Sequence, residues 1–284
     1  MQETIVTTLL LPLALGFIMF GLGLDLSVAD FKRVVVYPKA VLIGLAVQML
    51  LLTTVAFGLA VALGLPPELA VGLMLLAASP GGATANVFSH LAKGDVALNI
   101  TLTAINSVLC LLTLPLIVHF ALAWFMNSDQ YVPPPFRKVI EVGLIIIIPV
   151  IVGMTIRAQL PRFAAAAEKP LKILSVFLLV ALVAWSVYQE WDTMPSYFAQ
   201  VGLACLLFNL ISMGAGYLAP LAAKLPRRQA IAIAMEIGVH NGTLAIYIAL
   251  TVLGSSAMSV PAAVYSLIMF VTAGIFATYL AKRA

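Results

Sequence analysis

Residues 77–86 of the chain read AASPGGATAN, and residues 235–243 read MEIGVHNGT. Both stretches lie inside apolar runs of the length that crosses a membrane as a helix. The first stretch has a proline and two glycines near its middle. The second has two glycines together with an acid, an imidazole and an amide. A continuous helix is therefore not expected in either. In lipid, unwound backbone persists only where protein buries it or where it lines a wet cavity. We therefore expect the two breaks to face each other.

The composition around these stretches is that of a membrane protein. Of the 284 residues, 63% are hydrophobic and 9% are charged, whereas soluble domains contain about 45–50% apolar residues. The loops are too short for a large catalytic or nucleic-acid-binding domain outside the membrane. We predict an all-α polytopic membrane protein with nine transmembrane helices, at residues 4–26, 40–63, 69–92, 96–126, 138–158, 171–189, 199–223, 229–254 and 261–281.

Basic residues are distributed unevenly between the ends of these spans. With this span assignment, all but Arg137 and Lys138 of the 15 lysines and arginines fall on one side. Basic residues accumulate in cytoplasmic loops, so we expect the N-terminus outside and the C-terminus in the cytoplasm. The first run has no preceding Lys or Arg and no small-residue cleavage pattern, which indicates a span rather than a signal peptide. The expected location is the inner (plasma) membrane.

The positions of the two broken spans suggest an internal repeat. They are the third and the eighth of the series. Successive spans cross the membrane in opposite directions, so two spans that are five apart run one inward and one outward. Transporters built from inverted-topology repeats show this relation. We therefore predict that spans one to four mirror spans six to nine, and that the fifth span has no partner.

Glu236 is the one acidic residue that this assignment places deep in the membrane. A charge at the bilayer centre costs at least about 2.5–3.5 kcal/mol, so a cation or proton site is the default interpretation, with a protonated structural glutamic acid as the alternative. We expect no Lys or Arg at the same depth, so a bound cation would balance the charge. Hard cations prefer oxygen ligands, and the candidates besides Glu236 are Gln48, Asn86, Asn99 and Thr103.

The half-helices that restart after the breaks favour an anion. Their first N–H groups have no partner within the helix and lie at the positive end of the helix dipole. The residues concerned are Ala83 and Thr84 in the first break, and Asn241, Gly242 and Thr243 in the second. Cation ligands beside an anion receptor are typical of a cation-coupled carrier of organic anions.

Four stretches resemble the bile acid:sodium symporter family. They are residues 16–24 (GFIMFGLGL), 80–87 (PGGATANV), 91–98 (LAKGDVAL) and 236–242 (EIGVHNG). The resemblance implies a core domain that contains the crossed broken helices and a panel domain packed beside it. This chain looks like a nine-span variant that lacks the first panel helix, which accounts for the unpartnered fifth span.

The resemblance also implies domain boundaries and two sodium sites. Residues 1–39 correspond to the first panel helix, 40–126 to the first core repeat, 138–189 to two panel helices and 199–284 to the second core repeat. The implied first site contains Ala85, Asn86, Asn99, Thr103 and Glu236; the implied second site contains Gln48, Glu236, Ile237, Val239 and His240. Ala85 and Asn99 stand where the family pattern has serine, and His240 stands where it has glutamine. An imidazole is a poor sodium ligand, so the second site is expected to be weak, formed by carbonyls or pH-sensitive.

The predicted function is sodium-coupled symport of a small or amphipathic organic anion by alternating access, not an enzymatic reaction. The residues leave a bile acid-like or a pantoate-like carboxylate open as substrate. A proton-coupled symporter and a cation/proton antiporter of similar fold are the alternatives, and His240 keeps both open because it can titrate. The ring of His240 either faces the cations, faces the substrate or has a structural role. Sodium is the expected co-transported ion; no organic cofactor, nucleic acid or obligate protein partner is expected.

Overall fold

The computed structural model describes residues 11–126, 136–189 and 194–282, and these residues are almost entirely helical. Residues 4–10 of the first predicted span lie outside the described part. The α-helices are α1 (Leu11–Asp25), α2 (Val28–Lys32), α3 (Pro38–Ala46), α4 (Leu52–Ala62), α5 (Pro67–Ala78), α6 (Ala83–Leu91), α7 (Val96–Phe125), α8 (Phe136–Gln159), α9 (Pro161–Gln189), α10 (Met194–Ala222), α11 (Arg227–Gly238), α12 (Gly242–Tyr247) and α13 (Val260–Ala281). The fold class is therefore all-α, as predicted.

Within the described residues, four helices are long and apolar enough to cross a membrane. They are Pro38–Ala62, Val96–Phe125, Ser196–Ala222 and Ala257–Ala281, and the pair Pro12–Asp25 and Val28–Val35, bent by 69°, would make a fifth. Each of the four coincides with a predicted span, so the protein is a multi-pass membrane protein. The broken helices are individually shorter than a membrane span, and the total of nine spans remains a prediction.

Two π-helical turns lie inside the spans, and we did not predict them from the sequence. One (Val47–Leu51) joins α3 to α4, and the other (Ile248–Val252) extends α12. Such turns often mark functional sites, because the extra residue changes which side chains face the helix neighbours. The first turn contains Gln48, a predicted cation ligand.

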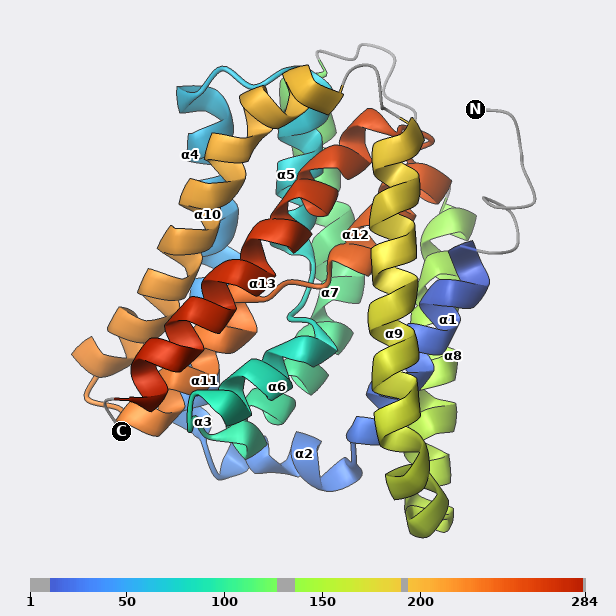
Figure 1. Ribbon diagram of the computed structural model, residues 1–284, viewed down its shortest axis with the longest axis vertical. Coiled ribbons are helices and arrows are strands. Elements are labelled where there is room, and N and C mark those ends of the chain that lie inside the picture. The colour runs from blue at the N-terminus through green and yellow to red at the C-terminus, as the bar shows by residue number, and fades with distance from the viewer. Residues whose placement is uncertain (1–10, 127–135, 190–193, 283–284) are drawn as a thin grey trace.

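Helices α1, α8 and α9 pack against one another on one side of the molecule (Figure 1). Glycines allow α1 and α8 to approach closely, since a Cβ at Gly23 would overlap the Val150 carbonyl oxygen. A Cβ at Gly153 would lie 2.5 Å from the Phe20 oxygen. Small residues at such crossings are characteristic of helix association in membranes.

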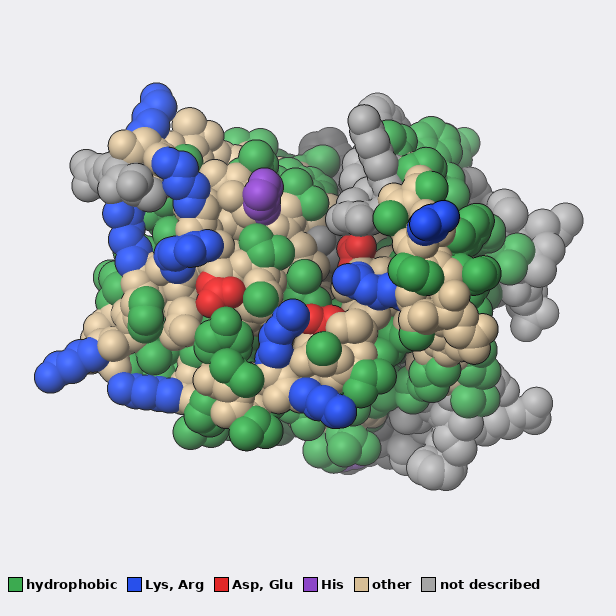
Figure 2. All heavy atoms as spheres, turned by 90° about the horizontal axis from the view of Figure 1, so that it is seen from below, with side chains coloured by type: hydrophobic (Ala, Val, Ile, Leu, Met, Phe, Trp, Pro, Cys, Tyr) green, Lys and Arg blue, Asp and Glu red, His purple; other side chains and the backbone are tan. Residues whose placement is uncertain are grey.

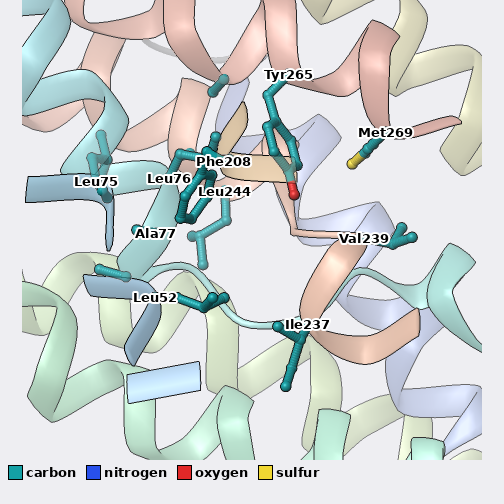
Figure 3. Packing of buried hydrophobic residues seen from close by; sticks show 14 of the residues in the cluster. Leu52, Leu75, Leu76, Ala77, Phe208, Ile237, Val239, Leu244, Tyr265 and Met269 are labelled. Carbon is teal, nitrogen blue, oxygen red and sulfur yellow. The ribbon is translucent and has the colours of Figure 1, made fainter. Parts of the chain in front are cut away.

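The remaining helices form the larger part of the molecule. Helix α10 packs on α11 and α13, and α5 packs on α7. Buried apolar side chains surround the segments where two spans are broken, including Ile237 at the end of α11 and Val239 within the second break (Figure 3). This packing encloses irregular backbone inside protein, as a lipid environment requires.

Lysine and arginine side chains gather on one end of the molecule, as Figure 2 shows. This is the end where α2 lies in Figure 1. There, Arg33 forms an ion pair with Asp30, which also caps α2 by accepting a hydrogen bond from the Ser27 N–H at 2.6 Å. The clustering agrees with the uneven distribution in the sequence.

Candidate functional site

The two predicted helix breaks are confirmed, and they meet. Helix α5 ends at Ala78 and α6 begins at Ala83, while α11 ends at Gly238 and α12 begins at Gly242. Between them, Gly81 and His240 form an antiparallel β-bridge. The Gly82 N–H donates to the Val239 oxygen at 2.7 Å, and the Asn241 N–H donates to the Pro80 oxygen at 2.8 Å. Each break thus satisfies the backbone of the other.

The glycines of the first break also permit a close approach to Glu236. A Cβ added at Gly81 would overlap the Glu236 carboxyl group, and one at Gly82 would lie 3.1 Å from the His240 oxygen. Gly81 is therefore needed for its small size as well as for its tendency to interrupt a helix. The carboxylate of one broken helix is held directly against the backbone of the other.

The Glu236 side chain is fully buried and is held by neutral groups. Its Oε2 accepts a hydrogen bond from Thr103 Oγ1 at 2.5 Å, and its Oε1 accepts one from Asn106 Nδ2 at 3.2 Å. The Gly81 backbone N–H is a third donor. Donors of this kind stabilise a carboxylate but leave its charge uncompensated, and an uncompensated buried charge is strongly unfavourable. The geometry therefore suits a carboxylate that binds a cation.

Several amide oxygens lie buried in this region without a hydrogen-bond partner in the described structure. They are Gln48 Oε1, Asn86 Oδ1, Asn99 Oδ1 and Asn106 Oδ1. Three of these amides are fixed through their nitrogens. Asn106 donates to Glu236, Gln48 Nε2 donates to the Ser79 oxygen at 3.1 Å, and Asn99 Nδ2 donates to the Ala232 oxygen at 2.7 Å. Buried polar atoms nearly always have a partner. Amide oxygens and a carboxylate form the donor set that a hard cation prefers.

The predicted first sodium site is brought together in part by direct contacts. Thr103 donates its single hydroxyl hydrogen to Glu236, and the backbone oxygen of Asn99, one turn earlier on α7, is an alternative acceptor 3.1 Å from the same hydroxyl oxygen. Asn86 and Ala85 are buried on α6, which packs against α7 and α11. Ala85 has no side-chain oxygen, so only its carbonyl group could act as a ligand.

The predicted second site has a different geometry from the first. The Val239 oxygen accepts the Gly82 N–H, and Ile237 is buried within α11. His240 and Gln48 converge on one atom, since His240 Nδ1 lies 3.2 Å from the Ser79 oxygen to which Gln48 also donates. Thus Gln48 and His240 lie close together, and the Val239 carbonyl already has a donor.

Comparison with known proteins identifies the family. A model of the sodium bile acid symporter family matches residues 12–196. The chain belongs to this family. It is 35% identical to the uncharacterized sodium-dependent transporter YocS of Bacillus subtilis (strain 168), over 95% of this chain and 82% of that protein. The family and these relatives are transporters, so the protein is a membrane transporter and not an enzyme.

Two further relatives carry names that include a transported compound. The chain is 26% identical to the probable chloroplastic sodium/metabolite cotransporter BASS2 of Oryza sativa subsp. japonica, over 90% of this chain and 60% of that protein. It is 25% identical to the ileal sodium/bile acid cotransporter of Oryctolagus cuniculus, over 85% of this chain and 69% of that protein. The names of these two relatives therefore give different transported compounds, a metabolite and a bile acid.

Some backbone N–H groups at the helix ends predicted to bind the anion already have acceptors within the protein. At α12, the Gly242 N–H donates to the His240 oxygen at 3.0 Å, and the Leu244 N–H donates to Asn241 Oδ1 at 3.1 Å. Thr243 is buried at the second position of α12 and Thr84 is half-buried at the second position of α6. The N–H groups of Ala83, Thr84 and Thr243 have no acceptor within their own helices, because they lie in first turns; the side chain of Ala83 lies outside the described part.

Gly242 has a packing role that the sequence did not indicate. A Cβ at this position would overlap Ser266 Oγ on α13. Its small size is therefore required for contact between α12 and α13, whether or not a substrate lies near it.

The His240 ring packs against two aromatic rings, and the sequence did not predict these contacts. It stacks on Phe208 of α10 with ring centroids 5.6 Å apart, and it meets the edge of Tyr265 of α13 at 5.4 Å. The Phe208 and Tyr265 rings lie side by side next to the second break (Figure 3). Nε2 of His240 is buried without a hydrogen-bond partner in the described structure. These contacts fix the ring between α10 and α13.

Two polar residues that were not among the predicted site residues contact the site. Asn106 donates to Glu236, and Asn209 of α10 donates to the Gly238 oxygen at 3.0 Å. A sequence signal existed for Asn106, because Asn99, Thr103 and Asn106 are spaced four and three residues apart and so share one face of a helix. Asn209 shares its helix face with one polar neighbour, Ser212, which is a weaker signal than the three polar residues on α7.

Proposed function

We propose that the protein is a secondary transporter that couples sodium entry to the uptake of an organic anion by alternating access. The observation that carries this proposal is the buried Glu236 carboxylate, held by neutral donors at the crossing of the two breaks and accompanied by unpartnered amide oxygens. The names of the relatives, which describe sodium-dependent transport, support the choice of sodium. Because the hydrogen-bond partners of Glu236 are neutral, we favour a bound cation over a mechanism in which two titrating groups exchange protons.

The first sodium ion would bind Glu236 together with Thr103, Asn86 and Asn99, with the Ala85 carbonyl completing the set. Their oxygens are of the kinds that hard cations prefer. A second ion would bind Glu236, Gln48 and backbone carbonyls of the second break. The Ser79 contact uses Nδ1 of His240 and leaves Nε2 without a partner; because an imidazole nitrogen is a poor ligand for sodium, we do not assign the ring to the ion.

The substrate carboxylate would bind at the starts of α6 and α12, close to Ala83, Thr84 and Thr243. Sodium at Glu236 would compensate the negative charge beneath these helix ends and so favour a second anion there. The β-bridge between Gly81 and His240 links the two broken helices, and it offers a mechanical route by which ion binding at one break affects the other. A small metabolic carboxylate and an amphipathic bile acid-like anion both satisfy this chemistry.

The architecture that we propose for this mechanism has nine spans, with α1, α8 and α9 as the panel and the other helices as the core. Support for an inverted repeat comes from two equivalent contacts. In the first half, Gln48 of the second span donates to the carbonyl oxygens of Ala77 and Ser79, where the third span breaks. In the second half, Asn209 of the seventh span donates to the Gly238 oxygen, where the eighth span breaks. Each half thus uses an amide side chain from the preceding span to hold its break.

Transport by the purified protein in proteoliposomes tests this proposal. Taurocholate and pantoate, each labelled, would be offered with an inward sodium gradient, an equal potassium gradient and a proton gradient. Uptake of one of them driven by sodium alone is the expected result. Uptake driven equally by a proton gradient would replace the sodium proposal with proton coupling.

A further inference from the structure

The surface of α13 carries an open groove that the proposed transport mechanism does not use. The groove has a volume of about 610 Å³ and follows one face of the helix from Phe270 to Lys282. Val271 and Ile275 are 63% and 65% exposed on this face. Helix α13 lies on the near face of the molecule in Figure 1, and it is part of a helix that is long and apolar enough to cross a membrane. Lipid rather than water therefore covers the groove.

The groove has an apolar wall and an open floor. A Cβ added at Gly274 would meet no atom within 4 Å, so the helix surface is hollow at this glycine. The Phe270 ring is held against Phe88 of α6, with ring centroids 6.1 Å apart. Thr278 donates its hydroxyl hydrogen to the Gly274 oxygen at 2.8 Å, so that hydrogen is used within the helix. This surface suits the hydrocarbon chain of a lipid, which gains many weak contacts with apolar atoms.

The groove ends at positively charged groups. No charged residue occurs from residue 260 to residue 281, and the exposed Lys282 lines the end of the groove. The Arg227 guanidinium of α11 lies close by, since it donates to the Leu280 oxygen at 3.4 Å. Tyr279, one turn before Lys282, is of the type that lies at the lipid–water boundary. The C-terminus lies at the same end of the molecule as α2 in Figure 1, which is the basic end in Figure 2.

We propose that this groove binds an anionic phospholipid, with an acyl chain over Gly274 and the phosphate group at Lys282 and Arg227. Basic side chains beside a membrane span attract anionic headgroups, whereas a zwitterionic lipid would gain only the apolar contacts. The inference is independent of sodium coupling, because Glu236 and the two helix breaks form no part of the groove.

A second copy of the chain is a less suitable occupant of this face. A two-fold dimer in a membrane has its axis along the membrane normal, so contact through α13 would place two Lys282 side chains at the same depth. Like charges at short distance repel each other. A phospholipid instead brings the opposite charge to the same position.

Native mass spectrometry of the delipidated protein in detergent tests the proposal. Phosphatidylglycerol and phosphatidylcholine with identical acyl chains are offered in equal amounts, and the bound fraction of each is measured. We expect the parent to bind phosphatidylglycerol more tightly, by about fivefold for each cationic side chain that contacts the headgroup. Equal binding of the two lipids would overturn the proposal.

Lys282→Gln tests the charged end of the groove. It should lower the affinity for phosphatidylglycerol about fivefold and leave the affinity for phosphatidylcholine unchanged. Arg162→Gln is the matched control, because Arg162 is also exposed but lies near the start of α9, outside the groove. An equal fall in the two variants would overturn the proposal, because it would show a general effect of net charge.

Gly274→Leu tests the apolar part, because its side chain would fill the floor of the groove. It should weaken the binding of both lipids, whereas Gly214→Leu on α10, whose added Cβ also meets no atom within 4 Å, should not. Leucine favours a helix more than glycine, so both variants should fold. Unchanged lipid binding in Gly274→Leu would overturn the proposal. So would a parent that is a dimer without bound lipid and that Gly274→Leu converts to a monomer, since a second copy would then occupy the groove.

Discussion

At the scale of single residues, the groups that solvate the Glu236 carboxylate decide whether it can bind a cation. Thr103 and Asn106 donate to its two carboxylate oxygens, and both donors lie on α7. A charge this deep is expensive unless it has a partner or a function. Because its hydrogen-bond partners are neutral, we propose that a bound ion supplies the positive charge and that each neutral oxygen nearby adds to the affinity for that ion.

Thr103→Val should weaken sodium binding and leave the fold intact. Valine has nearly the same shape as threonine but removes the hydroxyl that bonds Glu236. Hydrogen bonds to charged groups contribute about 1.5–3 kcal/mol, so we expect the half-saturating sodium concentration for uptake to rise about tenfold or more. Thr101→Val is the control, since Thr101 is also buried on α7 but donates to the Ala97 oxygen. An equal effect of the two substitutions would contradict the assignment of Thr103.

The sequence indicated which polar residues lie near Glu236, but it did not indicate all of the contacts that the neighbouring residues make. Glu236, Thr103 and the buried amides were selected because polar groups are rare in apolar spans, and that signal is strong. The capping contact of Asn241 with Leu244 and the contact of Gly242 with Ser266 were missed, because both depend on local geometry and on a helix distant in sequence. The aromatic contacts of His240 were missed for the same reason, because they come from α10 and α13.

At the scale of elements, the two breaks act as a unit. The sequence predicted where both occur, because Pro80 and the glycines interrupt helices and their backbone must be buried. It did not predict the β-bridge that joins them or the π-turn that contains Gln48. Proline and glycine mark a break through local conformational preference, whereas a π-turn within an apolar run has no distinctive residue.

Gly81→Ala should disrupt the ion site more than an ordinary glycine substitution. The added methyl group would overlap the Glu236 carboxyl group, so the two breaks would have to move apart. We expect sodium-dependent stabilisation to be lost in thermal unfolding measurements. Gly58→Ala on α4 is the control, because no atom lies within 4 Å of its added Cβ and alanine favours the helix by about 0.5–1 kcal/mol. A Gly81→Ala protein with the sodium response of the parent would show that the breaks do not need this close contact.

At the scale of the whole molecule, α1 packs on α8, and these two helices of the predicted panel are far apart in the sequence. The sequence indicated apolar spans and their boundaries but not which helices pack together, since lipid-facing and protein-facing surfaces are both apolar. Four predicted spans agree with long helices of the structure. The grouping of spans into panel and core came only from the resemblance to the family and stays a prediction; the glycine contacts explain why α1 and α8 pack closely.

Gly153→Leu should destabilise the protein by separating α1 from α8. The larger side chain would meet the Phe20 oxygen and the backbone of Gly23, and overpacking of this kind costs about 1–3 kcal/mol. We expect a lower thermal unfolding temperature with the sodium-dependent increase retained, since the ion site lies elsewhere. Gly143→Leu on the same helix is the control, because its added Cβ meets no atom within 4 Å. Equal unfolding temperatures for the two variants would contradict the packing argument.

The orientation of the molecule gives a further prediction. The basic end of the protein in Figure 2 should face the cytoplasm. A fluorescent protein fused after residue 284 should therefore fluoresce in cells, whereas alkaline phosphatase fused there should be inactive. Active alkaline phosphatase at this position would contradict both the orientation and an odd number of spans with the N-terminus outside.

Sodium binding at Glu236 can be tested by the thermal unfolding of Glu236→Gln in sodium and in potassium. The amide keeps the shape of the side chain and removes its charge, so the protein should fold. For the parent and for Glu68→Gln, which changes an exposed carboxylate at the start of α5, the account predicts a higher unfolding temperature in sodium than in potassium. For Glu236→Gln it predicts equal temperatures in the two salts. A full sodium-dependent increase in Glu236→Gln would contradict the claim.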